Sequence, residues 1–290
     1  MKTTILITGA TGNTGLPLVK QLSAGGVPIR AMLHTPEKKR MVEGSMVEVV
    51  VGDFKNRASM EQAMQGIESA YLVSPPSLDQ VRDQTAFVDA AKAMGVKHIV
   101  KLSALGTAPD SPVGLLRWHA EVEEHIRGSG LQYTFLHPHF FMENLLANAG
   151  TVKKEGTIYS PLGDASISPV SVGDIAAVAA AVLTKGEHAG KTYTLTGPEA
   201  VTFAGIAWTL GGVIGKPVRY VQVPFDAALQ GMVQAGYPDW LAAELVKLMQ
   251  TWSEGKGSSV SLQGERLTGL TPVSIAQFFA KHKSLFLAAA

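Results

Sequence analysis

The sequence contains no cysteine, which excludes disulfide bonds, thiolate metal sites and a cysteine nucleophile. Neither sign of charge dominates, since 25 basic and 24 acidic residues give a net charge of +1. The composition therefore predicts no nucleic acid or other polyanionic partner. Long hydrophobic runs are missing too: the longest, Ile175–Leu183, falls well short of the roughly 18 apolar residues of a membrane span. We read that run as a buried helix, and we expect a cytoplasmic protein without a membrane partner.

The first half of the chain alternates between short apolar, β-branched segments and amphipathic helical segments. Glycine or proline follows most of these segments, as at Gly25-Gly26 and Pro75-Pro76. Expected strands are Thr3–Thr8, Val27–His34, Val47–Val51, Ser69–Val73, His98–Leu102 and Gln132–Leu136; expected helices are Asn13–Ala24, Ser59–Gln65, Gln80–Met94 and Leu116–Arg127. Such alternation predicts βαβ units, a parallel sheet and helices wound onto both of its faces.

After Pro138 the alternation loosens, and helical patterns dominate. Helices are expected at Gly173–Leu183, Phe203–Ile214, Phe225–Ala235, Asp239–Ser253 and Pro272–Lys281, and strands at Lys191–Thr196 and Val218–Val223. We therefore predict an α/β protein with a doubly wound Rossmann domain and a smaller α+β C-terminal substrate domain. The Rossmann domain is expected at 1–150, with returning segments at about 165–196, and a mainly helical cap at 197–290.

A glycine-rich turn follows the first expected strand and opens the first expected helix. Its glycines are Gly9, Gly12 and Gly15. Glycines let the backbone turn sharply and approach a pyrophosphate closely, and the first N–H groups of a helix attract an anion. The spacing differs from GxGxxG, but the strand before and the helix after it are those of a dinucleotide site. The alternative is a purely structural β-to-α turn.

The end of the second strand bears on the choice between the two nicotinamide cofactors. An acidic residue there would bind the adenosine ribose hydroxyls and repel a 2′-phosphate. This chain has His34 at that place, followed by Lys38, Lys39 and Arg40. The missing acid favours NADP(H) over NAD(H). Asp53 and Phe54, after the third strand, are candidates for contacts to the adenine, although Asp53 also suits a turn.

Several motifs together resemble the NmrA-like branch of atypical short-chain dehydrogenases. They are TGATGNTG at 8–15, VGDF at 51–54, KHIVKLSA at 97–104, YTFLHPHFFMEN at 133–144, SPVSVGDIAAVAAAVL at 168–183 and YTLTGPEAVTFAGIA at 193–207. The resemblance covers nearly the whole chain. It implies a Rossmann domain with a small substrate domain that binds NADP(H). The family includes reductases of quinones and triphenylmethane dyes as well as redox-sensing regulators without known turnover.

The resemblance also assigns places to individual residues. It implies pyrophosphate contacts at Gly9, Thr11, Gly12, Asn13 and Thr14, nicotinamide ribose contacts at Ser74 and Pro75, and carboxamide contacts at Pro138, His139 and Phe140. Two positions depart from the family's pattern. Arginine is common in the family where this chain has His34 and His137.

The proton-donating pair of ordinary short-chain dehydrogenases is absent. In those enzymes a tyrosine four residues before a lysine protonates the forming alkoxide. None of the six tyrosines here is followed by a lysine at that spacing. Ser103 falls at the place of the family's serine, and His119 at the place of the lysine. Both are candidates for catalysis. The structural alternatives are that Ser103 caps the end of the strand and that His119 is an ordinary histidine on a helix surface or in the core.

Without that pair, a flat conjugated acceptor is the favoured substrate, because its delocalised charge requires less local acid. Phe140, Phe141, Met142, Tyr237 and Trp240 are the expected aromatic and thioether lining of its site, although each also suits core packing. We predict an NADPH-dependent reductase of a quinone-like or other conjugated aromatic acceptor. Two alternatives remain: a non-catalytic NADP(H) sensor that binds a partner protein, and a carbonyl or imine reductase with Ser103 or His119 as proton donor.

Two further groups of polar residues receive a structural interpretation. His137 and His139 share a face of an extended segment, but a metal site would need a third ligand, and we expect none. The acidic run Glu121, Glu123 and Glu124 is expected to form a solvated helix face. The sequence predicts no particular oligomeric state.

Overall fold

A computed structural model describes residues 4–287, and their contacts separate into two compact units. Unit 1 comprises the chain up to Pro138 together with Val172–Thr194, and unit 2 comprises His139–Ser171 and the chain from Leu195 onward. The chain thus leaves unit 1 directly after Pro138, twelve residues before the boundary expected at 150, because the sixth strand ends there. No helix in the described range is long and apolar enough to cross a bilayer.

Unit 1 is built on a seven-stranded parallel sheet in the order β3-β2-β1-β4-β5-β6-β9, the α/β Rossmann architecture that the sequence predicts. Its strands are β1 Ile5–Ile7, β2 Ile29–Leu33, β3 Val47–Val51, β4 Ser69–Leu72, β5 His98–Leu102, β6 Gln132–Pro138 and β9 Lys191–Leu195. The strand order reverses between β1 and β4. Ligands of such sheets bind outside the carboxyl ends of the strands at this point.

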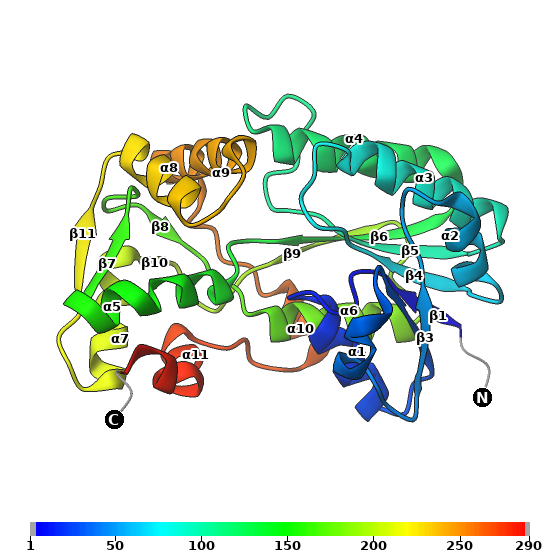
Figure 1. Ribbon diagram of the computed structural model, residues 1–290, viewed down its shortest axis with the longest axis horizontal. Coiled ribbons are helices and arrows are strands. Elements are labelled where there is room, and N and C mark those ends of the chain that lie inside the picture. The colour runs from blue at the N-terminus through cyan, green and yellow to red at the C-terminus, as the bar shows by residue number, and fades with distance from the viewer. Residues whose placement is uncertain (1–3, 288–290) are drawn as a thin grey trace. The chain divides into compact units, whose positions relative to one another are not determined.

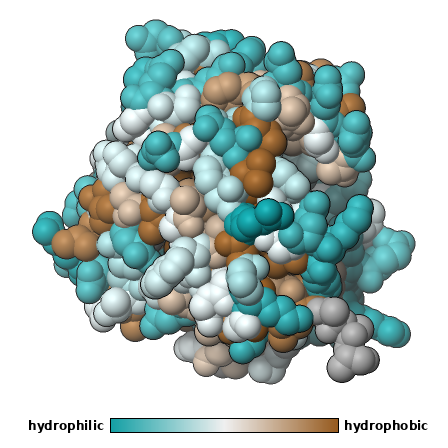
Figure 2. All heavy atoms as spheres, turned by 90° about the vertical axis from the view of Figure 1, so that its left-hand side faces the viewer, coloured by the Kyte–Doolittle hydropathy of each residue, from teal (hydrophilic) through white to brown (hydrophobic). Residues whose placement is uncertain are grey.

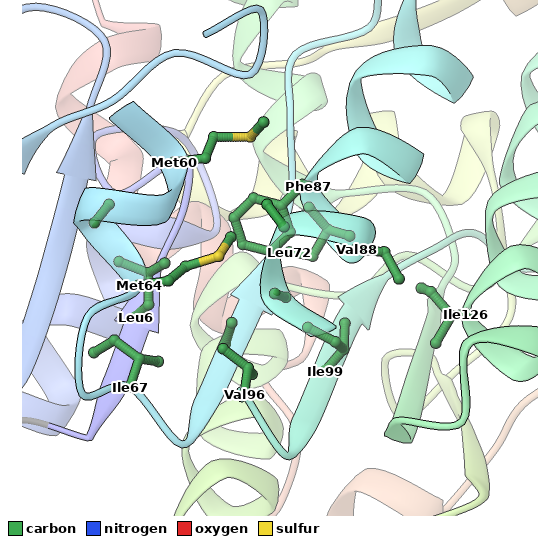
Figure 3. Packing of buried hydrophobic residues seen from close by; sticks show 14 of the residues in the cluster. Leu6, Met60, Met64, Ile67, Leu72, Phe87, Val88, Val96, Ile99 and Ile126 are labelled. Carbon is green, nitrogen blue, oxygen red and sulfur yellow. The ribbon is translucent and has the colours of Figure 1, made fainter. Parts of the chain in front are cut away.

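Helices cover both faces of this sheet (Figure 1). They are α1 Gly15–Ala24, α2 Arg57–Met64, α3 Gln80–Ala93, α4 Gly114–Ser129 and α6 Val172–Thr184. α2, α3 and α4 lie on one face, and α1 and α6 on the other. Figure 3 shows the core on the first face, where Met64, Phe87 and Ile126 from three helices pack against Leu72 and Ile99 of the strands. The apolar run at 175–183 forms most of α6 and is buried, as expected.

Unit 2 combines helices with two small sheets. The helices are α5 Ala149–Glu155, α7 Phe203–Ile214, α8 Phe225–Gln234, α9 Asp239–Thr251, α10 Gln263–Thr268 and α11 Ile275–His282. β7 Thr157–Ser160 pairs in parallel with β11 Arg219–Gln222, and β8 Ser166–Ile167 pairs antiparallel with β10 Val201–Thr202. The sequence did not predict α5, α10, β7, β8 or β10. Elements of two to seven residues are too short to display a hydrophobic period.

Four short helical turns complete the described elements: η1 Pro36–Met41, η2 Met142–Asn148, η3 Trp252–Lys256 and η4 Lys283–Phe286. On the face drawn in Figure 2, apolar side chains form small patches separated by polar ones. Trp208 of α7 is the most exposed large hydrophobic residue of the described range, at 81%. Scattered exposed apolar residues of this kind are ordinary on a protein surface.

Candidate cofactor site

The glycine turn lies at the carboxyl end of β1, between that strand and α1. Gly9 has a φ of +56°, and an added Cβ there would lie 2.7 Å from Cγ1 of Val73. The amide of Gly12 donates to the carbonyl of Gly9 at 2.8 Å and closes the turn. At Gly15 a Cβ would lie 2.1 Å from the same carbonyl oxygen. Gly9 is therefore required by its positive φ and the closeness of Val73, and Gly15 by close packing of backbone on backbone.

A buried threonine ties this turn to the neighbouring strand. The hydroxyl of Thr8 lies 2.8 Å from the Val73 carbonyl and accepts a hydrogen bond from the Val73 amide at 2.9 Å. Thr8 is 0% exposed. These two hydrogen bonds join the ends of β1 and β4 at the point where the strand order reverses. Sequence reasoning missed Thr8 as a site residue, although it is the first residue of the TGATGNTG motif.

The N-terminus of α1 has the properties of an anion-binding site. The N-cap residue Thr14 makes no side-chain capping hydrogen bond, and the first turn holds no acidic residue. Within residues 4–287, the backbone amides of Asn13 and Thr14 donate no hydrogen bond to a protein acceptor. Unpaired amides at the start of a ten-residue helix attract a phosphate group. The residues present therefore fit the pyrophosphate of a dinucleotide.

The carboxyl ends of β2 and β3 carry the residues expected near the adenosine. His34 and Lys38 are exposed, with Lys38 in η1, and no ion pair engages Lys38 in the described range. Asp53 accepts a hydrogen bond from the amide of Lys55 at 2.9 Å, so one of its carboxylate oxygens stabilises the turn after β3. Phe54 packs against Phe87, with ring centroids 5.5 Å apart. Phe54 is half-buried and contributes to the core.

Ser74, after β4, is oriented by a buried glutamine. The side-chain amide of Gln84 in α3 donates to Oγ of Ser74 at 2.8 Å. Because that bond occupies an acceptor site of the hydroxyl, the Ser74 hydrogen stays available to a ligand. Pro75 follows as an exposed residue. Gln84 is 1% exposed, and its role was not foreseen from the sequence.

Behind the strand ends lies a buried polar network that joins β5, β6 and α4. The carboxylate of Glu123 accepts hydrogen bonds from the hydroxyl of Ser103, from Nε2 of His137 at 2.8 Å and from Arg127 at 3.0 Å. Arg127 also lies over the ring of Phe135, 4.9 Å from its centroid. Glu123 is 2% exposed, so the expectation of a solvated face is wrong for this residue. Burial alone would raise the pKa of Glu123, but the hydrogen bonds and charge of its partners lower it.

A second buried pair interacts electrostatically with Glu123. Nζ of Lys101 lies 2.7 Å from Nδ1 of His119 and donates to the carbonyl of Leu102 at 3.1 Å. Lys101 is 0% exposed, and its burial lowers its pKa to about 7. Burial, followed by the charges of Lys101 and His137, holds the pKa of His119 well below its ordinary value. One ring nitrogen of His119 is therefore in hydrogen-bonding contact with the amine of Lys101.

The remaining site candidates belong to unit 2, in and after the segment that follows β6. Nδ1 of His139 accepts a hydrogen bond from the amide of Phe140, and the His139 ring stacks on Trp252 with centroids 5.0 Å apart. Burial lowers the pKa of His139 to about 4. Met142 is wholly buried in the core of unit 2, which is the core-packing alternative considered for it.

Three other expected lining residues differ in exposure. Phe141 is half-buried and forms a β-bridge with Val170. Tyr237 is 44% exposed, and Trp240 is half-buried in α9.

The two histidines that share a face of the extended segment each have a partner of their own: His137 binds Glu123, and His139 binds a backbone amide. The described residues contain no cluster of side chains that could hold a metal ion.

Comparison with known proteins agrees with this geometry. The model of the NmrA-like family matches residues 1–275. NAD(P)H azoreductase of Xenophilus azovorans is 35% identical over 98% of this chain and 100% of its own length. The NADPH complex of an NADPH-dependent quinone oxidoreductase from Escherichia coli superposes with a TM-score of 0.87 at 31% identity, covering 97% of this chain and 99% of that one.

A third similar protein is the triphenylmethane reductase of Citrobacter sp., complexed with NADP(H). It has a TM-score of 0.86 at 27% identity and covers 96% of this chain and 99% of its own. The family match covers nearly all of the sequence, and the fold and the glycine turn are those that the motifs predict. The chain therefore belongs to the NmrA-like family.

Proposed function

We propose that this NAD(P)H-dependent reductase uses NADPH to reduce a planar conjugated acceptor such as a quinone or an azo compound. The observation that carries the proposal is a tight glycine turn at a Rossmann switch point in a chain without a Tyr–Lys proton pair. When bound, the cofactor supplies a hydride. A conjugated acceptor spreads the resulting charge and so needs no strong acid beside it.

Residues of the chain would bind and orient the cofactor. The amides of Asn13 and Thr14, at the start of α1, would hold the pyrophosphate, and the glycines allow it to approach. Ser74 would donate to the ribose, since Gln84 occupies an acceptor site of its hydroxyl. Support for the acceptor class comes from the relatives, which are named for azo compounds, quinones and triphenylmethane dyes.

A panel of acceptors tests this function. We expect the purified protein to oxidise NADPH with quinones, azo dyes and triphenylmethane dyes, and at least about 100-fold more slowly with aliphatic ketones, because ketones require the proton donor that is absent. The measurement is the loss of nicotinamide absorbance with each acceptor. Tight NADPH binding without oxidation by any acceptor would instead favour a non-catalytic sensor. A pull-down with and without NADP⁺ would then identify a partner protein.

The preference for NADPH is tested at Lys38. We expect Lys38→Ala to weaken NADPH binding by about 3- to 10-fold and to leave NADH binding unchanged. The reason is that an ion pair with the 2′-phosphate exists only in NADPH. Fluorescence titration with both cofactors measures the two dissociation constants. Lys92→Ala, an exposed lysine at the end of α3, is the matched control. Equal losses for NADPH and NADH in Lys38→Ala would remove Lys38 from 2′-phosphate recognition.

A further inference from the structure

The hydroxyl of Ser103 has a single hydrogen, and the structure shows where it goes. Ser103 directly follows β5, at the carboxyl edge of the sheet, and is 5% exposed. Its hydroxyl donates to Oε1 of Glu123. The hydroxyl of Thr107 lies 3.3 Å away but gives its own hydrogen to the carbonyl of Ala104 at 2.7 Å. Ser103 is therefore left with oxygen lone pairs and no hydrogen to offer.

The helix α4 holds Glu123 in the state that accepts this hydrogen. His119, Glu123 and Arg127 follow one another at intervals of four residues and so share one face of α4. Arg127 and His137 both donate hydrogen bonds to the carboxylate. An ionised carboxylate is an acceptor only and has no hydrogen to return to Ser103. The two donors Arg127 and His137 hold the buried carboxylate as an acceptor, and this determines the orientation of the serine hydroxyl.

We propose that Glu123 is a positioning residue that fixes Ser103 as a hydrogen-bond acceptor, so that Ser103 binds an N–H or O–H donor of a bound ligand and does not supply a proton. The inference rests on the proposed function only for the identity of that ligand. The group that donates this hydrogen bond belongs to one of two molecules. It is either an amino or hydroxyl group on the ring of the substrate that is reduced, or the carboxamide of the nicotinamide. In the first case the protein would prefer a substrate that carries such an N–H or O–H group over a substrate of equal size without one.

The test is calorimetric and requires no turnover. Two acceptors of similar size, 2-amino-1,4-naphthoquinone and 2-methyl-1,4-naphthoquinone, are titrated into the protein loaded with NADP⁺, and NADP⁺ itself is titrated separately. If Ser103 binds the substrate, Ser103→Ala lowers the preference for the amino compound by about 3- to 10-fold, the value of one neutral hydrogen bond. If it binds the carboxamide, the same variant weakens NADP⁺ binding by that factor and leaves the quinone ratio unchanged. No change in either titration overturns the proposal.

The role of Glu123 is tested with a pair of neighbouring glutamates. Glu123→Gln retains the shape of the side chain but removes its charge, which frees the Ser103 hydrogen in part. It should shift the same titration as Ser103→Ala, in the same direction and by a smaller factor. Glu124→Gln, at a position whose side chain is 79% exposed, should match the wild type. A Glu123→Gln protein that keeps its melting temperature and matches the wild type in both titrations would contradict the positioning role.

Kinetics separate the acceptor role of Ser103 from a proton-donating one. We expect Ser103→Ala to lower the affinity for ligands by a larger factor than it lowers kcat for 2-methyl-1,4-naphthoquinone. A loss of 100-fold or more in kcat for both quinones, with unchanged binding, would make Ser103 the proton source and overturn the inference. A wild-type protein that binds NADP⁺ and the quinones but oxidises no NADPH would contradict the proposed function. The calorimetric test of Ser103 would still apply, because it measures binding only.

Discussion

Replacing Gly15 by alanine is expected to raise the Kd for NADPH by on the order of 100-fold or more. The new Cβ would lie 2.1 Å from the carbonyl oxygen of Gly9, a backbone atom that cannot move without opening the turn. The first amides of α1 would then no longer converge on the pyrophosphate. Loss of two charge-assisted hydrogen bonds, each contributing about 1.5–3 kcal/mol, accounts for that factor. Fluorescence titration of the purified variant measures it.

The matched control lies at the other end of the same helix. Gly25 has a φ of −77°, and an added Cβ would meet only carbonyl oxygens at 3.5 Å. Gly25→Ala should bind NADPH as the wild type does and unfold at a similar temperature. A Gly15→Ala protein that is folded by circular dichroism and binds NADPH within about 3-fold of the Gly25→Ala protein would contradict this role of Gly15.

The second large effect concerns the pH dependence of stability, and it arises at Lys101. Burial lowers the pKa of this amine from 10.5 to about 7. The difference corresponds to on the order of 5 kcal/mol of destabilisation when the amine is charged in both the folded and the unfolded chain. Below pH 7 the full penalty applies. Between about pH 7 and pH 10.5 the folded protein has lost the proton and the unfolded chain retains it, so this contribution to stability rises with pH.

Lys101→Met removes that dependence. Relative to wild type, the variant should be more stable at about pH 6 than at about pH 9 by roughly 3 kcal/mol in the free energy of unfolding. The variant also leaves Nδ1 of His119 without its partner, which costs about 1–3 kcal/mol at either pH and reduces the net gain. Scanning calorimetry at the two pH values measures the difference in Tm between the proteins.

Lys97→Met serves as the control, because the Lys97 side chain precedes the same strand but is 70% exposed. Its stability relative to wild type should be the same at both pH values. A Lys101→Met protein whose stability relative to wild type did not change between about pH 6 and pH 9 would show that the buried amine does not titrate in this range.

The sequence allowed most of unit 1 to be predicted because its signals are local. The glycine turn, the apolar strands and the helix stops each occupy a few consecutive residues, and β3, β5 and α7 have the predicted bounds. In unit 2 the strands β8 and β10 contain only two residues each, and their pairing depends on distant contacts.

The polar network shows which part of the site was accessible from sequence and which was not. Lys101 lies between Val100 and Leu102 in a strand of a parallel sheet, where both faces are buried, so its burial could have been inferred. The spacing of His119, Glu123 and Arg127 likewise indicates a shared helix face. That this face meets Ser103 and His137 depends on how α4 packs on β5 and β6, which no local pattern specifies.

The structure also narrows the roles given to two candidate residues. Ser103 was weighed as a proton source, and its hydrogen is held by Glu123. His119 was weighed as a proton donor, and one of its ring nitrogens faces Lys101. Both observations weaken the interpretation as a carbonyl or imine reductase with these residues as acids, and they favour an acceptor that needs no strong acid.

The most direct test of the central claim is the stoichiometry of an anaerobic reaction between NADPH and 2-methyl-1,4-naphthoquinone. We predict that the protein consumes one NADPH for each quinone converted to hydroquinone, and that Gly15→Ala loses this activity under the same conditions. Wild-type protein that binds NADPH but leaves both its absorbance and the quinone unchanged would contradict the account.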